Sequence, residues 1–321
     1  MFDRRSLVRR SRGGAREEHV YHQGWYPLAL STEVRPGALL GVDFLGSRVV
    51  VRRDASGRPV VQSGYCPHLG ADLSLGELRD GQLRCVFHHW CFDEAGECTQ
   101  IPNEPRIPPG ARISTYPSTE AWGLVWAFSG PEALFPPPEV PGIEEGAAAF
   151  RTEHLGVASF EPWLPTSNGF DFQHVRALHG IPIPAPEAVE VGAHRMSYTL
   201  CFGDSELRGL AIGTNTFALY RRDGADVTFR LWTGTPVGPG ETSCFSVVGL
   251  LAGEPTTDEQ RASLERRLDG LTAYMAKLRD EDYEVLRTMR FRTGALVEAD
   301  RHLAAYFKYV RGFPTAAPPA F

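Results

Sequence analysis

The stretch "YCPHLGADLSLGELRDGQLRCVFHHW", residues 65–90, decides how the first part of this chain folds and what it binds. It places Cys66 and His68 two positions apart and, after a gap of sixteen residues, Cys85 and His88 three positions apart. Two thiolates and two imidazoles can bind one Zn²⁺ tetrahedrally, or they can bind a cluster of two irons. Each of the two pairs combines one cysteine with one histidine. This favours the cluster, because each of two loops must give one sulfur to an inner iron and one imidazole to an outer iron.

The use of cysteine fits metal binding. Four of the six cysteines fall within 33 positions, at 66, 85, 91 and 98. An arginine pair near the start is followed by more charge, where an export signal needs about 7–15 apolar residues. No run approaches about 18 apolar residues either. We therefore expect a cytoplasmic protein with no membrane span, in which Cys91 and Cys98 are buried as small apolar side chains.

Length and composition predict two domains. The 321 residues are about twice the usual domain size of ~150 residues, and a net charge of −6 offers no field for nucleic acid. Short alternating segments with turn residues continue to Gly130, and five prolines then fall within residues 131–142. We predict an all-β domain over 22–130, a proline-rich linker over 131–146 and a second domain over 147–321.

The second domain shows a mixed pattern. Residues 214–220, 226–235 and 242–251 are predicted to form strands, because they are rich in β-branched and aromatic residues. A long helix is predicted from about Thr257, with Asp258 and Glu259 in its first turn.

The segments "CPHLGA" and "CVFHHW" resemble the two cluster loops of Rieske [2Fe–2S] proteins. Respiratory-chain members carry an extra cysteine in each loop, and here Ala71 and Phe87 stand at those positions. The resemblance is therefore to the Rieske domain of non-haem iron oxygenases and related ferredoxins, and it implies that Cys66, His68, Cys85 and His88 hold the cluster. His89 stands where these oxygenases usually have glycine, and we expect it to be accommodated beside the cluster.

A second group of candidate ligands occurs in "PTSNGFDFQHVRALHG", residues 165–180. Asp171, His174 and His179 follow the spacing Asp-x-x-His-x-x-x-x-His. Two imidazoles and a carboxylate on one face of a metal form the facial triad of Fe(II) oxygenases. On an ideal helix five residues turn His179 about 140° away from His174. We therefore expect the helix to be distorted or to end at His179.

This spacing resembles the mononuclear iron motif of Rieske oxygenases. The resemblance implies that His174 and His179 are iron ligands and that Asp171 is not. In the family this aspartate hydrogen-bonds an iron histidine and, across a subunit boundary, a cluster histidine, here His88 of a neighbouring subunit. Asn168 occupies a position where some members have a polar residue beside the iron.

A third, carboxylate ligand is expected from the long helix, which offers Asp280, Glu281, Asp282 and Glu284. An apolar stripe runs through Leu264, Leu268, Leu271, Met275 and Leu278, and its next steps are 282, Val285 and Met289. Asp282 is the acid in phase with this stripe, where a lone carboxylate is costly unless it is paired or bound to metal. The alternative is a carboxylate at the edge of the stripe, capped by Arg287 or Arg290.

The resemblance covers most of the chain, since "GWYPLA", "GECTQIP", "RIPPGARISTYP" and "GLVWAFSG" also follow the family in order. It implies an α+β fold, with an N-terminal all-β Rieske domain and a C-terminal helix-grip (START-like) catalytic domain that has an antiparallel sheet and a long C-terminal helix. The combination of "YCPHLGA", "GECTQIP" and "RIPP" is most similar to the branch of ketosteroid hydroxylases and cholesterol desaturases.

The expected activity is that of a terminal oxygenase. The cluster would accept electrons from an external ferredoxin or ferredoxin reductase, because the chain has no dinucleotide or flavin fingerprint. A mononuclear Fe(II) would then use O₂ to hydroxylate or desaturate a C–H bond of a bulky hydrophobic or natural-product small molecule, and the resemblance implies a homotrimer. Arene cis-dihydroxylation and O- or N-demethylation remain alternatives within this class. An electron-transfer or redox-sensing protein with a degenerate second domain is the alternative outside it.

Overall fold

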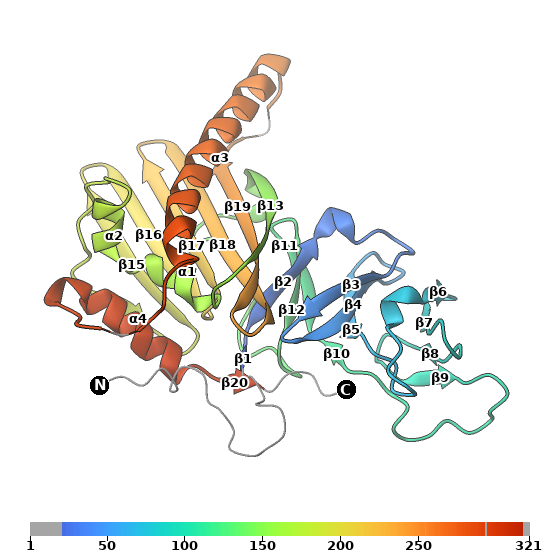
Figure 1. Ribbon diagram of the computed structural model, residues 1–321. Helices are drawn as coiled ribbons and strands as arrows, with labels where there is room; N and C mark the ends of the chain where they lie inside the picture. The colour runs from blue at the N-terminus through green and yellow to red at the C-terminus, as the bar shows by residue number, and fades with distance from the viewer. Residues whose placement is uncertain (1–20, 254, 293, 317–321) are drawn as a thin grey trace. The chain divides into compact units, whose positions relative to one another are not determined.

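The computed structural model describes residues 21–253, 255–292 and 294–316 (Figure 1). The arginine pair near the start lies outside these ranges. The described residues form two compact units, one made of 21–137, 235–239 and 315–316, the other of 138–234 and 240–314. Within the described ranges, none of the helices has the length and apolar character that crossing a membrane requires.

The first unit is built from short antiparallel strands. One sheet has the order β10-β5-β4-β3, a second β11-β12-β2 and a third β6-β7-β8-β9, while β1 pairs with β20. The strands are β1 Tyr21–His22, β2 Trp25–Leu30, β3 Leu40–Phe44, β4 Ser47–Arg53, β5 Pro59–Ser63, β6 Glu77–Arg79, β7 Gln82–Arg84, β8 Cys91–Phe92, β9 Cys98–Gln100, β10 Thr115–Tyr116, β11 Ser118–Ala121, β12 Leu124–Phe128 and β20 Thr315–Ala316. Two 3₁₀ turns, η2 Ser31–Glu33 and η3 Leu73–Leu75, complete it.

Two apolar clusters hold this unit together. The larger one lies among β2, β3, β4, β5 and β12 and includes Phe44, Val51 and Val125. The smaller one surrounds Cys66 and Cys85, and its other members are Val50, Leu73, Leu83, Phe92, Cys98, Ala111 and Ile113. Cys91 and Cys98 are both buried, as the sequence predicted.

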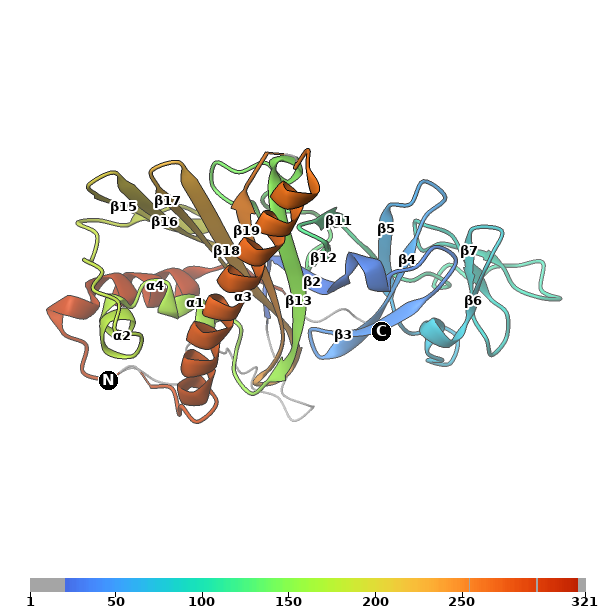
Figure 2. The same cartoon turned by 90° about the horizontal axis from the view of Figure 1, so that it is seen from above.

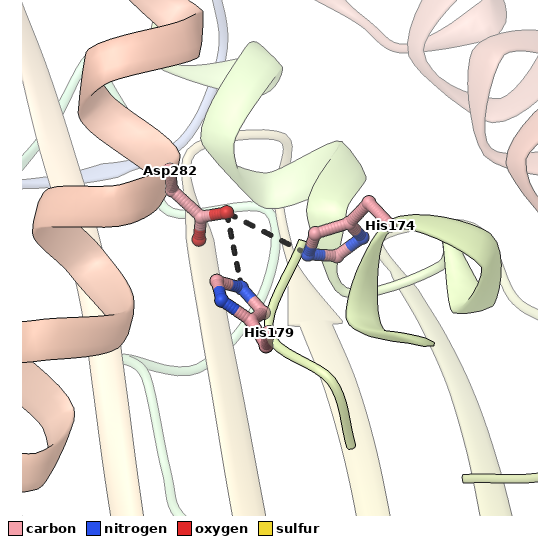
Figure 3. Close-up of side chains that lie close together, drawn as sticks. All are labelled: His174, His179 and Asp282. Carbon is pink, nitrogen blue, oxygen red and sulfur yellow. Dashed lines mark ion pairs between the residues drawn. The ribbon is translucent and has the colours of Figure 1, made fainter. Parts of the chain in front are cut away.

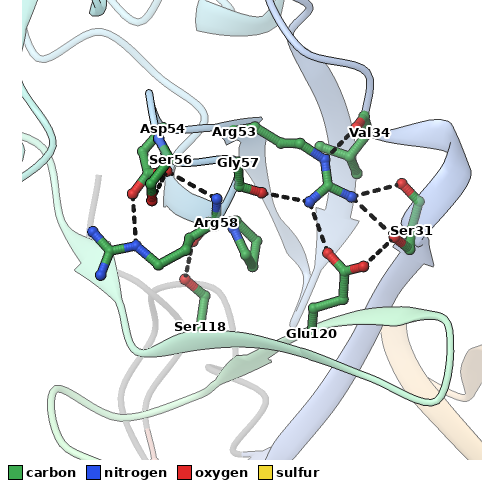
Figure 4. Close-up of polar contacts among 10 residues, drawn as sticks. Ser31, Val34, Arg53, Asp54, Ser56, Gly57, Arg58, Ser118 and Glu120 are labelled. Carbon is green, nitrogen blue, oxygen red and sulfur yellow. Dashed lines mark hydrogen bonds and ion pairs between the residues drawn. The ribbon is translucent and has the colours of Figure 1, made fainter. Parts of the chain in front are cut away.

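A polar network centred on Arg53 ties three segments of this unit together (Figure 4). The guanidinium donates to the carbonyl of Val34 at 2.7 Å, to the carbonyl of Gly57 at 2.7 Å and to the hydroxyl of Ser31 at 2.9 Å. It also pairs with Glu120 at 2.7 Å. The Arg53 side chain is largely buried. Its N–H groups donate both to backbone carbonyls and to a carboxylate, so the network fixes β4 against the η2 turn and β11.

The second unit is a seven-stranded antiparallel sheet with helices on one face (Figures 1 and 2). The strand order is β13-β19-β18-β17-β16-β15-β14. The strands are β13 Ala148–Ala158, β14 Glu190–Val191, β15 Arg195–Phe202, β16 Ser205–Ile212, β17 Thr216–Asp223, β18 Asp226–Gly238 and β19 Glu241–Leu251. The helices are η4 Glu145–Ala147, α1 Trp163–Asn168, α2 Phe172–Ala177, α3 Asp258–Leu286, η5 Glu298–Asp300 and α4 Arg301–Gly312. The predicted α+β class, with its antiparallel sheet and long helix, is confirmed.

Helix α3 begins as the sequence predicted. The Thr257 hydroxyl accepts from the backbone N–H of Gln260, whose side chain reaches back to the cap, so the two residues form a capping box. The sequence predicted that the buried stripe continues through Val285 and Met289. This part of the prediction is wrong, because both side chains are exposed. The helix ends at Leu286, and Tyr283 and Leu286 take the buried positions.

Candidate metal centres

The first cluster loop, residues 66–71, is a tight turn fixed by two backbone hydrogen bonds. The N–H of Cys66 donates to the carbonyl of Ala71 at 2.9 Å, and the N–H of Gly70 donates to the carbonyl of Cys66 at 2.8 Å. Gly70 has a φ of +77°, a conformation that glycine adopts without steric cost. The turn therefore fixes where the Cys66 sulfur points.

The second loop, residues 85–90, repeats the same turn. The N–H of Cys85 donates to the carbonyl of Trp90 at 2.9 Å, and the N–H of His89 donates to the carbonyl of Cys85 at 3.0 Å. His89 thus stands at the position that Gly70 holds in the first loop, and its φ is +60°. This explains why glycine is usual there: His89 is accommodated in a left-handed conformation that costs a residue with a side chain about 1–2 kcal/mol.

The four predicted cluster ligands are arranged as an inner and an outer pair. Cys66 and Cys85 are buried, whereas His68 and His88 are exposed, with their ring centroids 4.6 Å apart. Trp90 stacks on His68 at 4.7 Å. Burial, reinforced by the neighbouring Cys85, raises the pKa of the Cys66 thiol to about 12. Such thiols become thiolates when a metal supplies the compensating charge, so this set fits an iron–sulfur cluster bound by sulfur inside and imidazole outside.

In the second unit, the backbone at Gly169, between helices α1 and α2, lies close to the ring of Phe217. A Cβ on Gly169 would lie 2.3 Å from the ring of Phe217, so the chain can pass here only without a side chain. The next residue, Phe170, is buried and stacks on Tyr306 with ring centroids 5.2 Å apart. This anchor ends α1 and fixes where α2 starts.

Asp171 caps helix α2. Its Oδ1 accepts from the backbone N–H groups of Gln173 at 3.1 Å and His174 at 3.0 Å, a role typical of aspartate at an N-cap. The helix ends at Ala177, so His179 lies beyond it, as the five-residue step predicted. The rings of His174 and His179 consequently lie edge to face, with centroids 5.2 Å apart.

Asp282 reaches these two histidines from helix α3 (Figure 3). Its Oδ1 lies 3.2 Å from Nε2 of His179 and 3.7 Å from Nε2 of His174. That oxygen is buried and has no hydrogen-bond partner among the described residues. Among the described residues the predicted alternative of a cap by Arg287 or Arg290 is not seen: the ion-pair partners of Asp282 are His174 and His179, and the Arg287 guanidinium lies over the Tyr283 ring.

One ligand atom from each of His174, His179 and Asp282 falls within 4.8 Å of the others. An orphaned carboxylate oxygen between two imidazole nitrogens is explained by a cation that all three bind. Two nitrogens and one oxygen are the donor set of a mononuclear iron site with open positions. The residues therefore fit a mononuclear iron.

The other ring nitrogens of the two histidines are also engaged. Nδ1 of His174 hydrogen-bonds the backbone carbonyl of Asp171, and Nδ1 of His179 lies 2.8 Å from Oε2 of Glu281. Burial lowers the pKa of His174, which favours the neutral imidazole that a metal needs. Glu281 was missed by the sequence analysis, because it is out of phase with the buried stripe. The signal available was its position next to Asp282.

The segment after His179 is held by helix α4. Nε2 of His302 lies 2.7 Å from the carbonyl of Pro186, and Arg301 donates to the same oxygen at 3.1 Å. Arg176 donates to the carbonyl of Ile183 at 2.9 Å. These bonds limit how far His179 can move away from Asp282.

Asn168 is the last residue of α1, and its backbone carbonyl accepts from the N–H of Asp171 at 3.3 Å. The Asp171 carboxylate is 4.0 Å from Nδ1 of His174. A side-chain role for Asn168 beside the iron, and a bridge from Asp171 to His88 of another subunit, both stay predictions.

Comparison with known proteins agrees with this geometry. The family model for the Rieske [2Fe–2S] domain matches residues 24–117. Aminopyrrolnitrin oxygenase of Pseudomonas fluorescens is 33% identical over 196 residues, which cover 58% of this chain and 53% of that protein. Residues 24–117 therefore form a Rieske [2Fe–2S] domain, and over a longer stretch the chain is similar to Rieske oxygenases. A Rieske cluster and a mononuclear iron are accordingly its cofactors.

Other relatives of this chain have names that refer to steroids. The oxygenase component of 3-ketosteroid-9-alpha-monooxygenase from Rhodococcus rhodochrous is 39% identical over 127 residues, covering 39% of this chain and 33% of that protein. A cholesterol 7-desaturase of Xenopus laevis is 36% identical over 181 residues, covering 54% and 39%. The chain thus spans about half or less of the length of these three relatives.

Solved structures share the fold over nearly the whole chain. The structure of a variant of NdmA from Pseudomonas putida CBB5 with theobromine is 19% identical and has a TM-score of 0.70, and each chain is covered to 89%. Dicamba monooxygenase bound to dicamba is 18% identical with a TM-score of 0.62, covering 89% of this chain and 95% of that one. At this identity the likeness establishes the fold.

Proposed function

We propose that this chain is a terminal oxygenase that uses O₂ and externally supplied electrons to hydroxylate or desaturate a C–H bond of a bulky hydrophobic substrate. One observation carries the proposal: the unpartnered Oδ1 of Asp282 lies between Nε2 of His174 and Nε2 of His179, in a chain that also has a Rieske domain. A ferredoxin would need only the Rieske cluster and not the second site.

The proposal assigns each site residue a task. Cys66 and Cys85 bind the inner iron of the cluster, and His68 and His88 bind the outer one, at the exposed end of the centre. His174, His179 and Asp282 hold the mononuclear iron, which when bound supplies open positions for O₂ activation.

The chain's own groups prepare the iron site for binding. The backbone carbonyl of Asp171 holds the proton of His174 on Nδ1 and leaves Nε2 free to bind. Asp282 contributes the negative charge, and its side chain is only 15% exposed, so little water competes for it. Asp171 is assigned the polar bridge to His88 of a neighbouring subunit in a homotrimer, and Asn168 a polar position beside the iron.

Substrate class and partners follow from the relatives. The names of the ketosteroid monooxygenase and the cholesterol desaturase support a polycyclic or natural-product substrate. A ferredoxin, a ferredoxin reductase or both are proposed as electron donors, because the sequence has no flavin or dinucleotide fingerprint of its own. The cytoplasmic location stays a prediction.

The test is product analysis under ¹⁸O₂. The purified protein, a ferredoxin and its reductase are incubated with a panel of steroids, sterols and aromatic natural products, and the products are analysed by mass spectrometry. Incorporation of one labelled oxygen, or loss of two hydrogens, supports the proposal when the Asp282→Ala variant is inactive.

Other products would favour the alternative reactions. A relative named 3-chlorobenzoate-3,4-dioxygenase oxygenase subunit, from Comamonas testosteroni, is 31% identical over 197 residues and favours dihydroxylation as the second candidate. Incorporation of two labelled oxygens would identify that reaction, and release of formaldehyde would identify demethylation. Reduction of the cluster without any oxygen-dependent product would contradict the oxygenase proposal.

A further inference from the structure

His179 is contacted on both ring nitrogens by neighbouring residues of one helix. Its Nε2 lies 3.2 Å from Oδ1 of Asp282, and its Nδ1 lies 2.8 Å from Oε2 of Glu281. Consecutive residues of an α-helix point about 100° apart, so two adjacent acids can approach one imidazole from different sides. The His179 side chain is 5% exposed, and the imidazole is therefore enclosed between them.

Glu281 is committed mainly to His179. Its other oxygen, Oε1, lies 3.7 Å from Nζ of Lys277, whose side chain is 70% exposed. An exposed pair of this kind contributes little, because solvent screens it and the long lysine side chain loses freedom when it is held. The Oε2 oxygen faces Nδ1 of His179 at 2.8 Å, so this contact is closer than the one with Lys277.

The two candidate iron histidines are supported in different ways. Nδ1 of His174 hydrogen-bonds a backbone carbonyl, that of Asp171, which no substitution removes. Nδ1 of His179 hydrogen-bonds a side chain. The support of His179 can therefore be removed separately, while the turn that holds His174 stays intact.

We propose that Glu281 is a positioning residue of the mononuclear iron site, which holds the proton of His179 on Nδ1 and presents Nε2 to the metal. The inference rests on the proposed function, because it requires His179 to be an iron ligand. A carboxylate behind a ligating histidine fixes both its tautomer and its ring orientation and makes Nε2 a stronger donor. Helix α3 then supplies a ligand and the support of another ligand from adjacent positions.

Iron affinity is the direct test. Mononuclear iron is removed from the purified, cluster-containing protein with a chelator, and Fe(II) is titrated back without oxygen and detected as its nitric oxide adduct by electron paramagnetic resonance. Glu281→Ala is expected to weaken Fe(II) binding by about 10–100-fold. Glu281→Gln keeps an oxygen that accepts from Nδ1, so it should restore most of the affinity.

The matched control is Glu284→Ala, which removes an exposed carboxylate three positions further along the same helix and should leave the affinity unchanged. Thermal unfolding and the visible spectrum of the cluster report whether each variant is folded. Equal Fe(II) affinity in Glu281→Ala and wild type would overturn the inference alone, and so would an equal loss in the Gln and Ala variants. Failure of the wild type to bind Fe(II) through His174, His179 and Asp282 would instead overturn the proposed function.

Discussion

The two candidate metal centres are built in opposite ways. The cluster ligands come from two short loops, 66–71 and 85–90, and each loop is fixed by the same pair of backbone hydrogen bonds. The candidate iron ligands are His174 in the short helix α2, His179 two residues after its end, and Asp282 in α3, more than a hundred residues downstream of His179. The first centre depends on local turns and the second on how α2 and α3 pack on the sheet.

The difference also appears in burial and charge. In the cluster loops the sulfurs are buried and the imidazoles exposed, so one end of the centre meets solvent. In the iron site both imidazoles and the carboxylate are largely buried, and each imidazole is fixed through Nδ1. The first arrangement suits electron entry, and the second suits a reaction that must be protected from water.

Removing a cluster sulfur should have the largest effect. Cys85→Ser is expected to abolish the cluster, because it replaces a buried thiolate ligand of the inner iron by a hydroxyl, which binds iron far more weakly. Visible absorption and acid-labile sulfide should both be lost, while Fe(II) binding at the second centre persists. Retention of a full cluster would show that Cys85 is not a ligand.

Removing Asp282 should produce the opposite pattern. Asp282→Ala is expected to lose mononuclear iron and all turnover, because it deletes the only carboxylate of the donor set. The visible spectrum of the cluster should not change. Iron analysis together with that spectrum checks the prediction, and normal turnover of the variant would exclude Asp282 as a ligand.

Substitutions of Asp171 separate its two predicted roles. Asn caps a helix as well as Asp does, so Asp171→Asn should keep the stability of the protein and both metals and yet stop turnover, because the charged bridge is lost. Asp171→Ala should in addition lower the free energy of unfolding by about 1 kcal/mol. Thermal unfolding and steady-state turnover measure the two effects. A fully active Asn variant would leave Asp171 with the capping role alone.

Because the two cluster loops form the same turn, substitutions at its left-handed position are expected to change stability by small amounts of opposite sign. His89→Gly should stabilise the protein by up to about 1 kcal/mol, because relief of the left-handed strain exceeds the entropy that glycine costs. Gly70→Ala should destabilise it by about 1 kcal/mol, since a Cβ there meets open space but has a φ of +77°. Thermal loss of cluster absorption measures both. Changes of the same sign would refute the equivalence of the two turns.

The contrast between the centres explains what could be predicted from the sequence. Cys66, His68, Cys85 and His88 are readable because spacing within a local loop determines the geometry. Asp282 was predicted from the phase of the long helix, and the structure brings it to His174 and His179. The same phase failed for Met289, which lies beyond the end of the helix at Leu286, and for Val285, because Tyr283 and Leu286 take the buried positions of the last turn.

Contacts between distant elements were not readable. Glu281 is out of phase with the apolar stripe of the long helix. It reaches His179 only because the segment that follows α2 lies beside α3. The capping role of Asp171 could have been predicted from its position before a helical segment. Whether its carboxylate also bridges to another subunit depends on an assembly that the sequence of one chain does not encode locally.

The central claim is that one chain carries both centres, and the metal content of the purified protein tests it most directly. Elemental analysis with an acid-labile sulfide assay should find about three irons and about two sulfides per chain. The Asp282→Ala variant should retain about two irons with the same sulfide content. About two irons in the wild type, or zinc in place of iron, would contradict the account.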